Sequence, residues 1–143
     1  MLEPGEVRKR LRQKIEAIRR EAAARRQAVS EVQREYDRFL EDRAVPVFRQ
    51  MASALRAEGF LFQLLTPAGS VRLASERSGD DYIELALDTT EHPPVVVGRT
   101  SFVRGSRLTT SEAPIREGRH VRDLTDEDVL EYLLRVVGPF VER

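Results

Sequence analysis

Four carboxylates gather in the middle of the chain, and paired carboxylates are the groups with which nucleases and related hydrolases bind magnesium. The four are Asp80, Asp81, Glu84 and Asp88. The lysine that usually supports such a site is missing, because the only lysines of the chain are Lys9 and Lys14, near its start. Asp80 and Asp81 also follow a turn signal at residues 78–79, where acidic side chains need only local hydrogen bonds. We therefore favour a turn, and a small metal-dependent hydrolase is the third of three hypotheses.

No other motif indicates an enzyme. The two histidines, His92 and His120, fall in predicted loops, and neither has a second ligand at the spacing of a metal site. The chain has no cysteine, which excludes disulfides and thiolate chemistry. Residues 66–70 have one glycine and no lysine, unlike a phosphate-binding loop, and no serine lies in a nucleophile-elbow pattern. An enzyme is the class with the least support, and we expect no catalytic residue, no cofactor and no metal.

A predicted β-hairpin, residues 98–112, places two like charges at its tip. A two-residue turn with glycine first fits residues 105–106 and sets Arg104 opposite Arg107. The same register sets Arg99 opposite Glu112, an opposite-charge pair that supports it. Two arginines directly opposed are mildly destabilising, which raises the question of a function for them.

The tip could contact a phosphate or an acidic partner, because Phe102 shares a face with the two arginines and the arm is polar enough to protrude. The alternative, slightly favoured, is two side chains splayed into water. Together with the basic start of the chain, the candidate anion or nucleic-acid contacts are Arg8, Arg10, Arg12, Phe102, Arg104 and Arg107.

Residues 6–43 contain no glycine or proline and are predicted to form one long helix. Its apolar residues recur at alternating spacings of four and three, the coiled-coil pattern. This seam consists of Leu11, Ile15, Ile18, Ala22, Arg25, Val29, Val32, Tyr36 and Phe39. Arg25 is the one charged residue of the seam. At a core position of a coiled coil it would lower the stability of the helix pair, and it could determine the register or the choice of partner. So narrow a seam suits one partner helix better than a globular core, and the alternative is a helix that folds back on its own domain.

The residues beside the seam do not select a partner. Arg12, Arg19 and Arg26 line one side. A parallel homodimer would pair Glu21 with Arg26 but would oppose Lys14 to Arg19. An antiparallel homodimer would face the arginine line with itself. The protein partner is therefore either a second copy or a different chain, and a heteromeric partner with an acidic flank stays open.

Pro46 is predicted to break the long helix, with a hinge or kink near residues 44–46, because proline disfavours helical geometry at Val45 and can open a new helix. The second helix ends at Gly59. From residue 60 onward, five short apolar-rich segments with tight connections predict an antiparallel meander. Thr125, with Asp128 three residues later, predicts the cap of a last helix that covers the sheet.

The predicted fold is thus α+β: a long N-terminal coiled-coil-like helix, a second helix, a meander sheet of about five strands, and a C-terminal helix. The expected domains are residues 1–45, a coiled-coil helix, and residues 46–143, an α+β head, with Phe140 tucked against the core of the head. No apolar run approaches the roughly 18 residues of a membrane span, and the start resembles no secretory signal, so we expect a cytoplasmic protein without membrane contact.

The formal net charge of zero is unevenly spread along the 143 residues. Residues 5–30 carry nine basic and three acidic side chains, a net charge of +6, and residues 120–143 carry three basic and six acidic ones, a net charge of −3. The first hypothesis is a non-enzymatic interaction or assembly protein that oligomerises or docks through its N-terminal helix and presents its head to a larger complex, as an adaptor would. The second is a nucleic-acid-binding protein that uses the basic helix and the hairpin tip.

Overall fold

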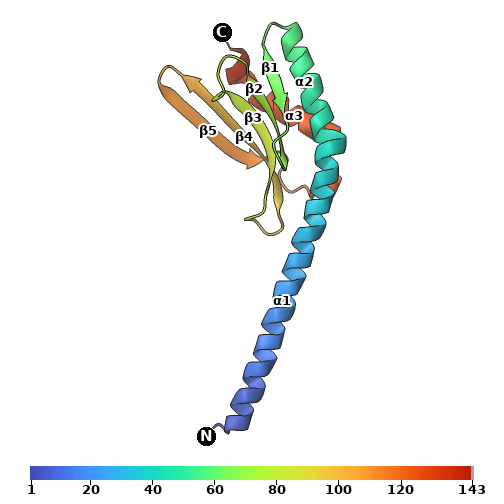
Figure 1. Ribbon diagram of the computed structural model, residues 1–143, viewed down its shortest axis with the longest axis vertical. Helices are drawn as coiled ribbons and strands as arrows, with labels where there is room; N and C mark the ends of the chain where they lie inside the picture. Colours follow the sequence, from blue (N-terminus) through green and yellow to red (C-terminus); the bar gives the residue numbers. More distant parts are fainter. Residues whose placement is uncertain (143) are drawn as a thin grey trace.

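Residues 4–57 form one nearly continuous helix. The computed structural model describes residues 1–142, and in it α1 (Pro4–Phe39) passes through a short π-helical turn, η1 (Leu40–Ala44), into α2 (Val45–Ala57). Pro4 lies in the first turn of α1, where its missing N–H costs nothing. The N-terminal part of α1 stands clear of the rest of the molecule (Figure 1).

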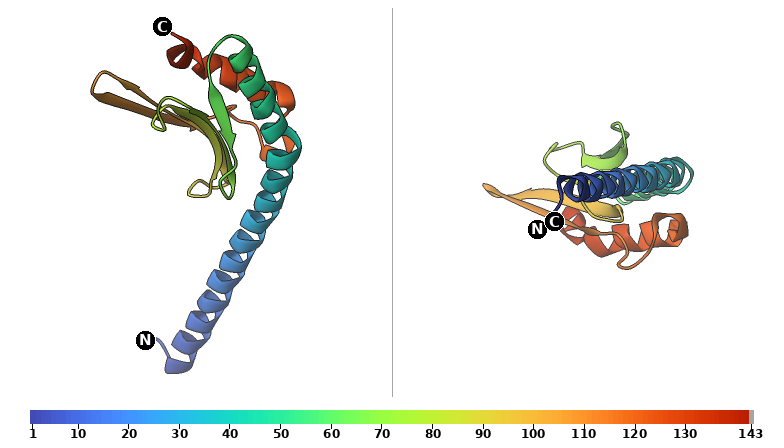
Figure 2. Two further views of the ribbon diagram at one scale, coloured as in Figure 1. Left: turned by 45° about the horizontal axis from the view of Figure 1, so that its top comes forward. Right: turned by 90° about the horizontal axis from the view of Figure 1, so that it is seen from below.

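The helix bends near residues 44–46, as predicted, but it does not end there, so the predicted break at Pro46 is wrong. Val45 keeps helical dihedrals, φ −59° and ψ −47°, and its N–H bonds to the carbonyl of Leu40, five residues back. A proline ring in a regular α-helix clashes with the carbonyl four residues earlier. The wider π turn directly before Pro46 relieves that crowding, so the helix bends instead of ending, as the left view of Figure 2 shows.

The predicted five-stranded antiparallel meander is confirmed. Its strands lie side by side in the order of the chain. They are β1 (Phe62–Leu65), β2 (Ser70–Ser75), β3 (Tyr82–Asp88), β4 (Val95–Arg104) and β5 (Arg107–Pro114). A short 3₁₀ helix, η2 (Val121–Asp123), leads into α3 (Asp126–Val136), and α4 (Gly138–Val141) ends the described chain. The fold is α+β, with α2 and α3 packed on one face of the sheet (Figures 1 and 2).

The hydrophobic core lies between that face and the helices. Leu73, Ile83 and Leu85 of the sheet pack there with Phe48 of α2 and Leu133 of α3. The end of α1 belongs to the same core, since it contributes Val32, Tyr36 and Phe39, and η1 adds Ala44. Buried residues therefore lie on both sides of residue 45, and the domain boundary at that residue stays a prediction. No helix within residues 1–142 combines the length and the apolar composition that crossing a membrane requires.

The C-terminal elements follow the local sequence signals. Thr125 caps α3 through a capping box with Asp128, as predicted. The ring of Phe140 packs edge-on against Phe62 and Phe102, with ring centroids 6.2 and 5.9 Å away, so the tail tucks against the core as expected. These contacts attach α4 to both the first strand and the β4–β5 hairpin.

Candidate functional site

The predicted seam of α1 lies in two different environments. Leu11, Ile15 and Ile18 are 58%, 38% and 50% exposed, and Ala22 and Val29 are half-buried. We call the first part the free seam, and it comprises Leu11, Ile15, Ile18, Ala22, Arg25 and Val29. The remaining three residues, the buried seam, are Val32, Tyr36 and Phe39, each no more than 7% exposed. The apolar pattern is continuous in the sequence, but its first part faces solvent and its last part is buried in the core.

The buried seam fixes α1 to the rest of the fold. The hydroxyl of Tyr36 donates a 2.7 Å hydrogen bond to the carbonyl oxygen of Gly69, in the turn between β1 and β2. Burial, with the nearby charges of Asp37 and Glu84, raises the pKa of Tyr36 well above its ordinary value. For these residues the helix does fold back on its own domain, which was the alternative to a coiled coil. Pairing of the free seam with another helix stays a prediction.

At its end nearest the sheet, the free seam forms part of the wall of a groove. It has a volume of about 510 Å³, in the range of pockets that hold side chains or small ligands. Its walls come from α1 and from His92, in the loop between β3 and β4, and it is lined by Ala22, Arg25, Arg26, Val29, Ser30, Gln33 and His92. The predicted loop position of His92 is confirmed, and the loop brings it beside the seam.

The arginines beside the free seam are exposed. Arg12, Arg19 and Arg26 form the arginine edge, and all three side chains face solvent. Arg10 pairs with Glu6 one turn earlier, with 3.0 Å between Nε and Oε1. Within residues 1–142, Arg8 and Arg12 form no hydrogen bond or ion pair. The basic start of the chain is therefore open to an anionic partner.

The hairpin has the predicted register, with Arg104 opposite Arg107 and Arg99 opposite Glu112. Gly105 has φ +63°, as a turn with glycine first requires. Arg104 does not splay: its Nη2 lies 2.7 Å from Oε2 of Glu142, and its guanidinium lies 5.5 Å from the ring centroid of Phe102. The repulsion between the two arginines is thus offset by a carboxylate from the C-terminal segment.

The structure does not bring the candidate anion contacts together. Phe102 packs on Phe140, Arg104 is paired with Glu142, and only Arg107 of the hairpin residues is left open within the described chain. Arg8, Arg10 and Arg12 lie at the opposite end of the molecule from the hairpin (Figure 1). A surface that uses both groups at once would have to span the whole length of the protein.

Three of the four carboxylates of the acidic cluster have separate partners. Asp81 accepts a 2.9 Å hydrogen bond from the backbone N–H of Val103, and Glu84 pairs with Arg72 at 3.2 Å. Asp88 accepts hydrogen bonds from the hydroxyl and the N–H of Thr90, which lower the pKa of Asp88. Within residues 1–142 no three histidine or acidic side chains converge as a metal site would need. The hydrolase hypothesis therefore gains no support from this cluster.

The other histidine is also held by its neighbours. Nδ1 of His120 accepts a hydrogen bond from the N–H of Arg122 and lies 3.5 Å from Oε2 of Glu35 on α1. Within residues 1–142 the Oε2 of Glu35 has no hydrogen-bond partner, so the bond from the Arg122 N–H is the one that holds the ring. The ring lies where η2 packs against α1, next to the buried seam. His120 therefore has a structural partner in the described chain, in the loop position predicted for it.

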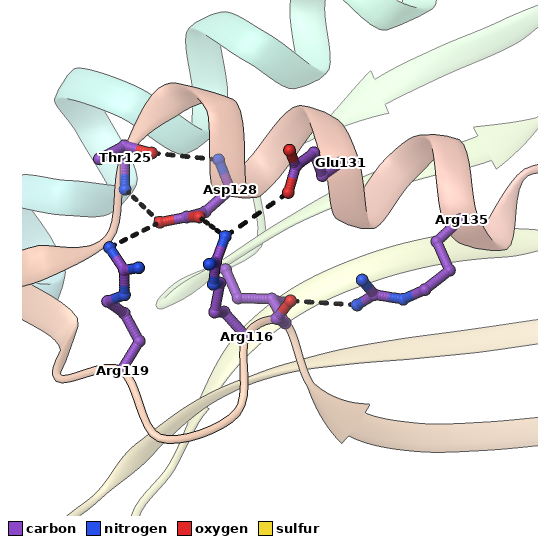
Figure 3. Close-up of polar contacts among 7 residues, drawn as sticks. Arg116, Arg119, Thr125, Asp128, Glu131 and Arg135 are labelled. Carbon is purple, nitrogen blue, oxygen red and sulfur yellow. Dashed lines mark hydrogen bonds and ion pairs between the residues drawn. The ribbon is translucent and has the colours of Figure 1, made fainter.

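One polar cluster was not foreseen as a cluster. Asp128 is 3% exposed, and Figure 3 shows Arg116 and Arg119 converging on its carboxylate, with N–O distances of 2.8 and 4.0 Å. Arg135 donates to the carbonyl of Ile115 in the same region. Burial alone would raise the pKa of Asp128. The hydrogen bonds with Thr125 and the positive charges of Arg116 and Arg119 have the larger effect together, so the pKa of Asp128 is lowered. The capping-box signal pointed to Asp128, but no local signal pointed to the arginines.

The two polar networks, at Asp128 and at the hairpin tip, join elements of the fold to each other, and apart from Arg107 their charged groups have partners within the described chain. The free seam differs, because its large apolar side chains and the charged edge beside it face solvent. It is the candidate site that the geometry supports best, as a docking surface. Comparison of the chain with protein-family models, with curated proteins and with solved structures finds no match.

Proposed function

We propose that this protein is a non-enzymatic interaction protein that docks, on a second copy or on another chain, through the free seam of α1. The observation that carries the proposal is the exposure of Leu11, Ile15 and Ile18 on one face of a helix that stands clear of the head. Burying a leucine or isoleucine side chain stabilises a complex by about 1.5–3 kcal/mol. Three such residues in a row provide a favourable surface for a partner.

The length of the free helix supports this interpretation. From Pro4 to Val29 the helix extends about 39 Å, at the usual rise per residue. Helices in proteins are stabilised mainly by the packing of an apolar face, and within the described chain no residue of this stretch belongs to the hydrophobic core. A partner helix would supply that packing, and the head would then be presented at the end of a rod, as in an adaptor or assembly subunit.

The test is to disrupt the free seam without touching the core. We would replace Leu11 and Ile18 with aspartate and compare the variant with Gln13→Asp/Ala24→Asp, which adds two negative charges on exposed positions off the seam. Val32 is unsuitable for this purpose, because it is 7% exposed and belongs to the core. A buried aspartate there would destabilise the head itself.

Sedimentation velocity and copurification of the tagged native protein are the readouts. We expect the wild type and the control variant to associate with the same partner and the seam variant to lose it, while the circular dichroism of the head is unchanged. Association that survives Leu11→Asp/Ile18→Asp would show that docking uses another surface.

Nucleic-acid binding is the second candidate, and the observation in its favour is the net charge of +6 over residues 5–30. It now depends on the helix alone, since Arg104 and Phe102 of the hairpin are engaged within the fold. Binding of mixed-sequence duplex that weakens steeply with salt, and that Arg8→Glu/Arg12→Glu removes, would support it. Binding that does not depend on salt would rule out phosphate contacts as its basis.

A further inference from the structure

The free seam ends where the sheet and its helices begin, and this limits what can dock on it. Val32 is covered by the fold, so a helix that lies on the seam has access only to the face between Leu11 and Val29. That face is about 28 Å long, or slightly less than three heptads. At the end nearest the head, the groove beside His92 forms the last part of this face. The part of the occupant that contacts the seam is therefore a short helical segment, because its continuation toward the buried seam would meet the head.

The arginine edge gives this face a charge. Arg12, Arg19 and Arg26 recur every seven residues, so they form a row along one side of the seam. All three are exposed, and within residues 1–142 none of them forms a hydrogen bond or an ion pair. Arg25 adds a fourth exposed cation on the seam itself, beside the groove. A partner that covers the apolar residues must lie against this row.

A second copy of the chain matches the arginine edge poorly. An antiparallel copy sets the edge against itself, and a parallel copy opposes Lys14 to Arg19. A parallel copy would also bring a second head to the level of the first, where the seam is already covered. Each copy carries a net charge of +6 over residues 5–30, so the two helices repel one another.

Acidic side chains at the flanking positions of a partner remove these conflicts. We propose, building on the docking function proposed above, that the occupant of the free seam is a short amphipathic helix with acidic residues along the flank that meets the arginine edge. Its apolar face covers Leu11, Ile15 and Ile18, and its carboxylates lie against Arg12, Arg19 and Arg26. Cross-helix ion pairs at such flanking positions set partner choice in helix pairs.

The test uses the full chain and two synthetic peptides of three heptads. Both peptides have isoleucine and leucine at the two seam positions, and the flanking positions are all glutamate in the acidic peptide and all lysine in the basic one. The chain variants are Arg12→Glu/Arg19→Glu/Arg26→Glu and a matched control, Lys9→Glu/Arg10→Glu/Arg20→Glu, which makes the same change in net charge off the arginine edge. Binding is measured by fluorescence anisotropy of the labelled peptide at low and moderate salt.

We expect the wild type and the control variant to prefer the acidic peptide by about tenfold, with a preference that weakens as salt is added. The edge variant should reverse that order and prefer the basic peptide. Equal loss of binding in both triple variants would overturn the proposal, because it would show a diffuse attraction such as nucleic acid also exploits. Equal affinity of the wild type for the two peptides, or no binding of either, would overturn it as well.

The failure of this inference can be told apart from the failure of the proposed function. If neither peptide binds but Leu11→Asp/Ile18→Asp still abolishes native association, the seam is a docking surface and only the acidic partner is wrong. If native association survives those aspartates, the proposed function itself is wrong. Sedimentation of the wild type as a dimer that the seam aspartates dissociate would identify a second copy as the occupant and would also overturn the inference.

Discussion

The hydroxyl of Tyr36 donates a hydrogen bond to the carbonyl oxygen of Gly69, 33 residues further along the chain, at 2.7 Å. This bond ties the last seam turns of α1 to the turn between β1 and β2. The direction in which the free seam leaves the head therefore depends on a buried side chain that belongs to the same heptad pattern as the exposed ones.

Tyr36→Phe should lower the free energy of unfolding by about 1 kcal/mol, the usual net value of one hydrogen bond. The loss stays modest because Gly69 is exposed and water can satisfy its carbonyl. Chemical denaturation at neutral pH measures it. An unchanged free energy of unfolding would show that the hydroxyl does not hold α1 in place.

The stability of the protein at alkaline pH gives a second test of the burial of Tyr36. Burial raises the pKa of Tyr36 above its ordinary value of 10.0 and raises the pKa of Tyr132 to about 12. The folded state holds both protons more tightly than the unfolded state, so this stabilisation is complete below pH 10 and is lost as the pH rises further. Above that pH the wild type should lose about 1.4 kcal/mol per pH unit for each tyrosine, and Tyr36→Phe should show a shallower slope. Equal slopes would contradict a raised pKa of Tyr36.

Gly98→Ala should destabilise the protein by about 1–3 kcal/mol, the cost of overpacking a core. A Cβ at residue 98 would collide with the ring of Tyr132, where α3 crosses β4, and neither the strand nor the buried ring is free to move away. Gly79→Ala is the matched control, because a Cβ there meets no atom within 4 Å. Thermal denaturation of both variants checks this, and equal midpoints would show that the ring has room to shift.

Asp128→Ala should cost more than Thr125→Ala. The threonine change removes the bond from the backbone N–H of Asp128 to the Thr125 hydroxyl, worth about 1 kcal/mol. The aspartate change leaves that bond in place but removes two bonds to its carboxylate, from the N–H of Thr125 and from Arg116, worth about 2–3 kcal/mol together. Because the pKa of Asp128 is lowered in the folded state, its contribution is present above pH 3.8 and is lost as the pH falls below it. Equal costs at neutral pH would mean that the arginines contribute nothing.

The two tip arginines of the hairpin should respond differently to the same substitution. Arg104→Glu should lower the denaturation midpoint, because it sets a new carboxylate against Glu142. Arg107→Glu should leave the midpoint unchanged or raise it slightly, since it places a carboxylate opposite Arg104. Thermal denaturation of the two single variants distinguishes the residues, and identical shifts would argue against the pair with Glu142.

The parts of the fold that could be predicted depend on local chemistry. The turn at residues 105–106 and the pair Arg99–Glu112 were enough to predict the hairpin register, because a two-residue turn allows only one register. The capping box of Thr125 and Asp128 likewise needs only neighbouring residues. From the sequence alone, Arg104 and Arg107 are expected to behave alike, because the partner of Arg104, Glu142, lies far from it along the chain.

The division of the seam could not be predicted, for a physical reason. Ile18 and Val32 occupy the same heptad position, and periodicity reports only that a face is apolar. Which part of that face is buried depends on where the loops that contain Gly69 and His120 lie against α1. The kink near Pro46 could be predicted, but the continuation of the helix through it could not, because the rule that proline ends a regular helix takes no account of a π turn.

Hydrogen–deuterium exchange of the chain alone and of its native complex, isolated through a tag, tests the central claim most directly. If the free seam is the docking surface, exchange of the amides between residues 11 and 29 should slow by about tenfold or more in the complex, because fraying of the free helix is suppressed. Amides of β5 and of α3 should be unchanged. Protection that appears on the head while residues 11–29 exchange as before would contradict the account.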